Sequence, residues 1–290
     1  MKLNNQQIVV GNLPQENLTT EHFRFKQTEV PTPSDGEVLV KILYIAIDAA
    51  SRAWMQGETY RAMLREGDIM PGLALAEVIQ SRVSHLIPRD LVLADTGWQT
   101  YATLPGDQLT KQPKISPLTH LLSVFGVPGL TAYFGLLRCG LPKAGETLVV
   151  SAAAGAVGSL VGQIGKIMGC RVIGIAGGDV KCRSLIEEFG FDYAVDYKKG
   201  NLEEQLRVSC PNDIDIYFDN VGGVILDTTL KLMAPHGRIV CCGAVSQYDK
   251  NKPSYRIENV SVRLIHTPYD ICKIKKEKKS CFLLSCILYL

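Results

Sequence analysis

Small residues with a distinctive spacing follow an apolar run in the middle of the chain. The run Leu148-Val-Val-Ser is followed by Ala153-x-Gly155-x-x-Gly158, which is the G-x-G-x-x-G pattern with alanine in its first place. The first glycine lets the backbone approach a pyrophosphate, and the second lets a helix pack closely on the strand. The helix N-terminus adds free N–H groups and a positive dipole. The pattern therefore predicts a dinucleotide site whose pyrophosphate contacts are Gly155, Ala156, Val157 and Gly158.

The residues after this motif predict the helix and strand that must position it. Apolar side chains recur with a 3.6-residue period, which predicts a buried helix face of Val157, Leu160, Val161, Ile164, Ile167 and Met168. Gly169 ends the helix, and Arg171-Val-Ile-Gly-Ile-Ala supplies a second strand. Together they form a βαβ unit of the expected ~30 residues.

The choice of cofactor depends on the residues just beyond the second strand. An acidic side chain there binds the ribose of NAD, whereas a cation binds the phosphate of NADP. The sequence is Gly177-Gly-Asp-Val-Lys181 with Arg183 following, and Asp179 lies past two glycines. We favour NADP(H), because Lys181 and Arg183 supply cations at this place. Asp179 is alternatively an N-cap that begins a helix over residues 180–189.

Composition and charge exclude several other kinds of function. The 290 residues carry 31 Lys and Arg against 29 Asp and Glu, a balance that is unlike the basic field of a nucleic-acid-binding protein. The nine cysteines are odd in number and scattered, without a C-x-x-C pair or a His/Cys cluster, so we expect reduced thiols, no metal and a cytoplasmic location. The N-terminal residues have no signal-peptide pattern, and no apolar run reaches the ~20 residues of a membrane span.

The sequence predicts three segments. Residues 1–125 are rich in short β-branched runs such as Glu37–Ile45 and Leu91–Ala94, with a further strand expected at Trp98–Tyr101, which predicts a compact β domain. Residues 126–260 alternate apolar runs with helical patterns, which predicts a parallel sheet. Its expected strands are Leu148–Ser151, Arg171–Ala176, Asp192–Asp196, Ile214–Asp219 and Arg238–Gly243. Residues 261–290 combine a basic run with a nearly apolar end and do not continue the alternation.

Residues 6 to about 258 resemble a known family. The segments that carry the resemblance are Ser151–Ser159, Gly174–Arg183, Tyr217-Phe-Asp-Asn-Val-Gly-Gly223 and Cys242-Gly-Ala-Val-Ser-Gln-Tyr248, with support upstream from Tyr44–Asp48 and Gly129–Leu136. The chain is similar to the zinc-free medium-chain dehydrogenase/reductases, in the branch of the prostaglandin and curcumin reductases. The resemblance implies an α/β fold, with a doubly wound Rossmann sheet and an N-terminal GroES-like β-barrel domain that carries most of the substrate cleft.

The resemblance also implies roles for individual residues. Lys181 and Tyr197 bind the adenosine 2′-phosphate of NADP(H), and the nicotinamide side is bound by Asn220, Cys242, Gly243, Ala244, Val245 and Ser246. Without the resemblance, Tyr197 reads as a surface aromatic residue and Asn220 as part of a loop at a strand end. The candidate catalytic residues are tyrosines, because a hydroxyl can stabilise an enolate oxygen. They are Tyr60, carried over from the family's substrate loop, Tyr248 and Tyr255.

The expected reaction is NADPH-dependent reduction of the carbon–carbon double bond of an α,β-unsaturated ketone or aldehyde. Three alternatives stay open: a quinone reductase of the same fold, an inactive NADPH-binding fragment and, disfavoured by the missing metal ligands, a zinc-dependent alcohol dehydrogenase. The expected partner is a small enone or enal. A homodimer also fits the family, in which the last strand commonly pairs across a dimer.

The chain departs from the family pattern in two regions. In the β domain, Pro71–Glu77 lacks usual glycines and Arg89 stands where glycine is common, which places a side chain at an expected positive φ angle. Beyond about Asn259 the sequence no longer follows the family, and we expect the next Rossmann strand to be missing and a sheet edge to be exposed.

Overall fold

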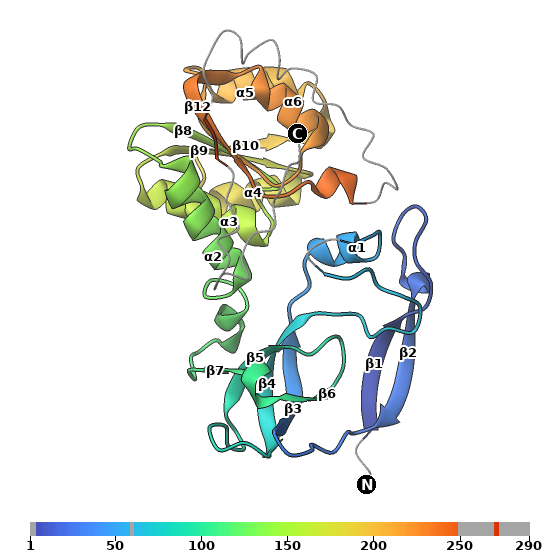
Figure 1. Cartoon of the computed structure of the whole chain (residues 1–290). Coiled ribbons are helices and arrows are strands. Elements are labelled where there is room, and N and C mark those ends of the chain that lie inside the picture. The colour runs from blue at the N-terminus through green and yellow to red at the C-terminus, as the bar shows by residue number, and fades with distance from the viewer. Residues whose placement is uncertain (1–3, 59–60, 249–269, 273–290) are drawn as a thin grey trace. The chain divides into compact units, whose positions relative to one another are not determined.

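The computed structural model describes residues 4–58, 61–248 and 270–272 of the 290 (Figure 1). The chain forms two compact units. The first comprises residues up to Leu122 together with Tyr248, and the second comprises Ser123–Gln247 and the strand at Asp270–Cys272.

The first unit is an antiparallel β domain. Its main sheet has the order β6-β3-β4-β5-β7, and β1 pairs with β2 in a separate hairpin. Alternating inward residues such as Val38, Val40, Ala76 and Val92 form a core inside the larger sheet. The strands are β1 (Asn4–Val10), β2 (Phe23–Glu29), β3 (Glu37–Ile45), β4 (Leu73–Ser81), β5 (Leu91–Asp95), β6 (Tyr101–Pro105) and β7 (Thr110–Gln112), with the short helix α1 (Ala50–Trp54) between β3 and β4.

The second unit contains a six-stranded parallel sheet of order β10-β9-β8-β11-β12-β13. Its strands are β8 (Thr147–Ser151), β9 (Arg171–Ala176), β10 (Tyr193–Asp196), β11 (Ile214–Asp219), β12 (Met233–Cys241) and β13 (Asp270–Cys272). From β8 the chain first winds toward β10 and then returns to the other side of β8 at β11. This reversal is the topological switch point of a doubly wound fold. The predicted fold class is confirmed.

Helices cover both faces of this sheet (Figure 1). One face packs against α2 (Val127–Phe134), α3 (Ala156–Ile167) and α4 (Asp179–Glu187), with Ala132, Val161 and Leu185 in its core. The other packs against α5 (Leu202–Ser209) and α6 (Gly223–Leu230), with Leu206 and Leu226 in its core. Because both faces are buried, β8 reads as a continuous apolar run and all five of its residues are buried.

The buried face of α3 differs from the predicted one. Ile167 and Met168 are exposed, and the fully buried stripe is Gly158, Val161, Gly162 and Gly165. The apolar period identified a helix correctly, but the residues nearest the sheet are glycines because they allow the closest approach of the helix backbone. Val157, Leu160 and Ile164 pack beside this stripe.

Three further predictions are corrected. Trp98 and Thr100 lie in bends, Gln99 forms an isolated bridge with Gln7, and the strand begins at Tyr101. The α4 helix is capped by Gly178, with φ at 94°, so Asp179 is its first residue and not its N-cap. A sixth strand is present, because Asp270–Cys272 pairs in parallel with Arg238–Val240. That stretch of β12 is therefore not a sheet edge.

Arg89 takes the backbone conformation that the family comparison predicts for this position. Its φ angle is 73°, in the region that favours glycine. Its N–H donates to the carbonyl of Val78, which closes the turn between β4 and β5 without glycine.

Candidate functional site

The predicted cofactor residues, from Gly155 to Ser246, all lie beyond the carboxyl ends of the parallel strands. They follow β8, β9, β10, β11 and β12, so the sheet brings them to one edge. In open α/β sheets this edge is where ligands bind, at the crevice beside the switch point. Here the switch point lies between β8 and β11.

The glycine turn after β8 has the geometry that a pyrophosphate site requires. Gly155 is the N-cap of α3, and no side chain accepts a hydrogen bond there. Because the first N–H groups of a helix have no intrahelical acceptor, those of α3 are available to a ligand. A Cβ at Gly158 would lie 2.4 Å from the carbonyl oxygen of Ala152 and 2.8 Å from the Cα of Ala153. Only glycine allows this approach, and it leaves the helix N-terminus open to an anion.

The turns after β9 and β10 are joined by one carboxylate. Asp196, the last residue of β10, accepts hydrogen bonds from the N–H groups of Gly178 at 2.9 Å and Lys198 at 3.0 Å. The bond from Gly178 is the largest cause that lowers the pKa of Asp196. Tyr197 lies against Gly177, where a Cβ would come within 2.8 Å of its ring. The segments that carry Lys181 and Tyr197 are therefore held side by side.

The charges at these turns are arranged around Asp179. Its carboxylate pairs with the Lys199 ammonium at 2.5 Å, and this contact raises the pKa of Lys199. The acidic side chain that could have bound a ribose hydroxyl is thus engaged by a cation. Lys181 and Arg183 are exposed on α4.

A buried hydrogen-bond network lies at the switch point. Asp219 is the last residue of β11 and is only 2% exposed. Its Oδ1 accepts hydrogen bonds from the hydroxyls of Ser151 (3.0 Å) and Tyr217 (2.8 Å) and from the N–H groups of Val221 (3.0 Å) and Gly222 (2.9 Å). Burial raises the pKa of Asp219, and these hydrogen bonds partly offset it. Burial and the nearby carboxylate raise the pKa of Tyr217 well above its ordinary value.

Asn220 is fixed by the same network. Its backbone N–H donates to the Ser151 hydroxyl and its side-chain amide donates to the Ser151 carbonyl, both at 2.8 Å. The side-chain oxygen of Asn220 remains as an acceptor. Gly222 and Gly223 follow with φ angles of 69° and 60°, which lets the chain turn sharply into α6.

The loop after β12 is attached to this turn. The N–H groups of Cys242 and Gly243 both donate to the Asp219 carbonyl, at 2.8 and 3.1 Å. The loop continues through Ala244 and Val245, and the Ser246 hydroxyl donates to the Val221 carbonyl at 2.7 Å. The predicted residues Asn220 and Cys242 to Ser246 thus come from two strand ends that the backbone ties together.

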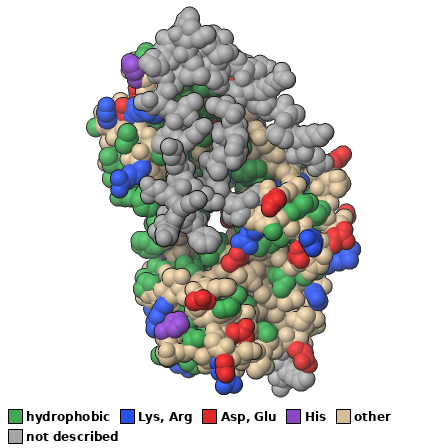
Figure 2. All heavy atoms as spheres, in the orientation of Figure 1, with side chains coloured by type: hydrophobic (Ala, Val, Ile, Leu, Met, Phe, Trp, Pro, Cys, Tyr) green, Lys and Arg blue, Asp and Glu red, His purple; other side chains and the backbone are tan. Residues whose placement is uncertain are grey.

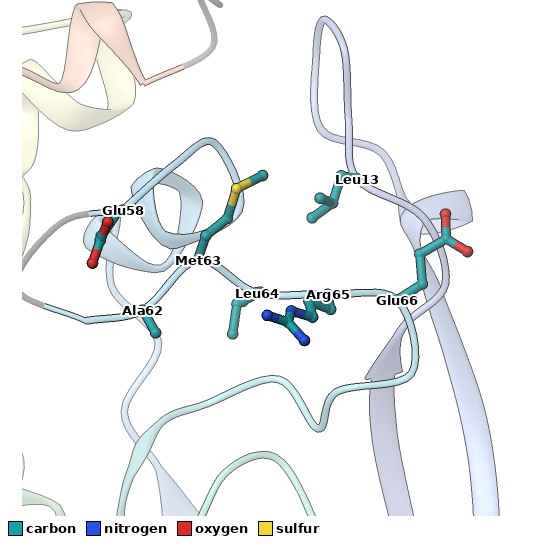
Figure 3. A pocket seen from close by; sticks show the side chains of 7 residues that line it. All are labelled: Leu13, Glu58, Ala62, Met63, Leu64, Arg65 and Glu66. Carbon is teal, nitrogen blue, oxygen red and sulfur yellow. The ribbon is translucent and has the colours of Figure 1, made fainter.

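Of the three candidate tyrosines, the structure describes Tyr248, which is partly buried. Tyr60 and Tyr255 lie outside the described residues. The sequence neighbours of Tyr60 line a surface hollow of about 520 Å³ in the first unit (Figure 3). Its lining residues are Leu13, Glu58, Ala62, Met63, Leu64, Arg65 and Glu66.

Sequence reasoning missed the buried residues that hold the site together. Ser151, Asp196 and Asp219 each end a strand, and a polar residue closing an apolar run was the available signal. Their roles depend on contacts between strands that are up to 69 residues apart in sequence, as for Asn220 and Ser151.

Other features of the described residues bear on the remaining expectations. They contain no group of three metal-binding side chains, and none of their helices is long and apolar enough to cross a membrane. Cys139, Cys170, Cys182, Cys210, Cys241 and Cys242 form no disulfide. On the face shown in Figure 2, Lys and Arg are interspersed with Asp and Glu.

Comparisons with known proteins show the family to which the chain belongs. Residues 6–112 match a family described as the N-terminal domain of oxidoreductase, and residues 156–269 match one described as zinc-binding dehydrogenase. The NADPH-dependent curcumin reductase of Escherichia coli is 42% identical over 252 residues, which are 86% of this chain and 72% of the relative. Prostaglandin reductase 1 of Bos taurus is 44% identical over 241 residues, 81% of this chain and 71% of the relative.

A solved structure completes the comparison. CurA of Vibrio vulnificus in complex with NADPH aligns with a TM-score of 0.85 and 38% identity, covering 94% of this chain and 83% of that one. The chain belongs to the medium-chain dehydrogenase/reductase superfamily. Within it, the curcumin and prostaglandin reductases are close relatives.

Proposed function

We propose that the chain is an NADPH-dependent reductase that acts on the carbon–carbon double bond of α,β-unsaturated ketones or aldehydes. The observation that carries this proposal is the gathering of an open helix N-terminus, a basic turn and a buried polar turn along one edge of the parallel sheet. These features fit the phosphates, the adenosine and the remaining half of a dinucleotide. The names of two relatives, an NADPH-dependent curcumin reductase and a prostaglandin reductase, support NADPH-dependent reduction.

The chain's own residues divide the binding of the cofactor. The N–H groups at Ala156, Val157 and Gly158 bind the pyrophosphate at the start of α3. Lys181 and Tyr197 bind the adenosine 2′-phosphate, and Asn220 with the loop Cys242–Ser246 holds the nicotinamide half. When bound, NADPH supplies the hydride.

The groups on the substrate side hold the carbonyl and manage its charge. As the β-carbon is reduced, negative charge develops on the carbonyl oxygen, and a tyrosine hydroxyl that donates to this oxygen stabilises it. The α-carbon then takes up a proton. Tyr60, Tyr248 and Tyr255 are the candidate donors. A Tyr60→Phe variant with an unchanged rate on enones would remove Tyr60 from this role.

Binding to the nucleotide is tested by fluorescence titration of NADPH and NADH. We expect NADPH to bind more tightly than NADH. We expect Lys181→Ala to weaken the affinity for NADPH by about tenfold or more, because a charged contact to the phosphate is lost. NADH lacks that phosphate, so its affinity stays within about twofold in the same variant. Lys26→Ala, at an exposed lysine on β2, is the control and changes neither.

The reaction itself is tested by NADPH oxidation with an enone, an enal and a quinone. Faster turnover of the enone or enal supports double-bond reduction. Preference for the quinone makes the chain a quinone reductase, and tight NADPH binding without turnover of any substrate makes it a nucleotide-binding protein only.

A further inference from the structure

The side chain of Asp219, at the end of β11, accepts hydrogen bonds from four donors. Two hydroxyls and two backbone N–H groups donate to a single carboxylate oxygen within 3.0 Å. Hydrogen bonds to a charged acceptor in a buried site are stronger than those to a neutral one. One side chain therefore sets the position of several groups together.

The network joins three strand ends. Ser151 contributes the end of β8 and Asp219 the end of β11, while the Asp219 carbonyl receives the N–H groups of Cys242 and Gly243 after β12. Ser151 has a double role, because its hydroxyl donates to Asp219 and accepts from the Asn220 N–H. Displacement of Ser151 or Asp219 would therefore move Asn220 and the loop after β12.

We propose that Asp219, acting through Ser151 and the turn Asn220–Gly223, is the positioning residue for the nicotinamide half of the cofactor site. This inference rests on the proposed function. Neither residue is a predicted ligand, and Asp219 is almost entirely buried. Both act by holding the Asn220 side-chain oxygen and the glycine turn in place.

The contacts of Asn220 explain why this positioning affects binding. One N–H of its side-chain amide donates to the Ser151 carbonyl, and this bond fixes the direction in which the side-chain oxygen can accept a hydrogen bond from a ligand. If the turn shifts, the amide is free to rotate and the oxygen loses its fixed direction. The turns after β9 and β10 depend on Asp196 instead, so the adenosine end remains unchanged.

The inference is tested with two ligands that share one end. NADPH contains both halves of the cofactor, whereas adenosine 2′,5′-bisphosphate contains only the end with the 2′-phosphate. We expect Ser151→Ala and Asp219→Asn each to weaken the affinity for NADPH by about tenfold, which is the effect of losing a charged hydrogen bond. The affinity for the bisphosphate should change by less than about twofold. Ser151→Thr keeps the hydroxyl and restores NADPH affinity.

A matched control separates positioning from general damage. Ser209→Ala removes another fully buried serine hydroxyl in the same unit, in α5, where it donates to the carbonyls of Gln205 and Leu206. It should leave both affinities unchanged. If Asp219→Asn does not fold, as judged by circular dichroism, Ser151→Ala carries the test alone.

The outcomes distinguish the two proposals. If the variants bind both ligands equally more weakly, or bind both as tightly as the unmodified chain does, the positioning role is overturned. The proposed function, which rests on NADPH binding by the unmodified chain, is not affected by either result. If the unmodified chain binds the bisphosphate but not NADPH, or binds neither, the proposed function fails and the positioning role fails with it.

Discussion

Arg89 occupies a backbone conformation that costs free energy with any side chain. Its φ angle of 73° brings the Cβ close to the neighbouring carbonyl oxygen, which glycine avoids. The turn is nevertheless kept by hydrogen bonds from the Arg89 N–H to Val78 and from the Ile87 N–H to Asp90. The strain is therefore confined to the backbone of Arg89, and a residue without a Cβ would relieve it while these hydrogen bonds stay in place.

We expect Arg89→Gly to raise the free energy of unfolding by about 1 kcal/mol, because the positive φ angle no longer strains a side chain. Urea unfolding followed by circular dichroism measures the change. Arg89→Ala is the control, since it removes the charge but keeps the Cβ. If the alanine variant is stabilised as much as the glycine variant, charge and not backbone strain is the cause.

Single residues also show how much of the candidate site could be predicted. Gly155 and Gly158 were identifiable because strand, turn and helix follow one another in sequence. Lys181 could be proposed from its place just after the second strand, whereas Tyr197, 16 positions further on, required either the family comparison or the pairing of β9 with β10. Asp219 was not identified as a site residue, because its partner Ser151 becomes a neighbour only when β11 pairs with β8.

At the scale of elements, α3 approaches the sheet through its glycines. A Cβ at Gly162 would lie 1.9 Å from the ring of Phe191, and one at Gly165 would lie 2.5 Å from the end of Leu148. Helix propensity favours alanine over glycine by about 1 kcal/mol in a helix interior. The clash at Gly162 involves a buried aromatic ring and opposes that preference.

We expect Gly162→Ala to lower the free energy of unfolding by about 2 kcal/mol, because overpacking a filled core outweighs the gain in propensity. Gly165→Ala should cost less, since the end of Leu148 can move. Thermal unfolding of both variants makes the comparison. The double variant Gly162→Ala/Phe191→Leu tests the cause: if it is no more stable than the sum of its single changes predicts, the ring is not the obstacle.

The elements themselves were largely predictable. The parallel strands from β8 to β11 were found within one residue, because buried apolar runs bounded by turns are a local signal. The start of β6 was missed since Trp98 bends the chain before the strand begins. The strand β13 was missed because a short stretch beside a basic run has no periodicity of its own, and pairing with β12 defines it.

At the scale of the whole second unit, an ion pair links distant parts of the chain. The Arg238 guanidinium on β12 binds both carboxylate oxygens of Glu146 and the carbonyls of Gly140 and Leu141. Both side chains are less than one-fifth exposed. Burial disfavours the charged form of Glu146, but the hydrogen bonds from Arg238 and Lys143 prevail and lower its pKa.

We expect Arg238→Ala to lower the free energy of unfolding by about 3 kcal/mol at neutral pH, because Glu146 would be left buried without its partner. The pKa of Glu146 is lower in the folded chain, so this stabilisation is present above its ordinary value of 4.5 and is lost as the pH falls through the folded value. Unfolding in urea at neutral pH and in steps below 4.5 should show the variant and the unmodified chain converging.

The exposed pair of Arg207 and Glu203 provides the comparison. Arg207→Ala should change the free energy of unfolding by less than about 1 kcal/mol, since solvent screens that pair. An equal effect of the two substitutions would show that burial does not determine the contribution of Arg238.

The buried turn after β11 should slow the exchange of its backbone amide hydrogens with solvent. The N–H groups of Asn220, Val221 and Gly222 donate to Ser151 and Asp219 side chains and not to water. Although these residues belong to no strand, their amide hydrogens can exchange with deuterium only when the network breaks. They should therefore exchange as slowly as the central strands, so that this part of the ligand edge opens only when the sheet beneath it unfolds.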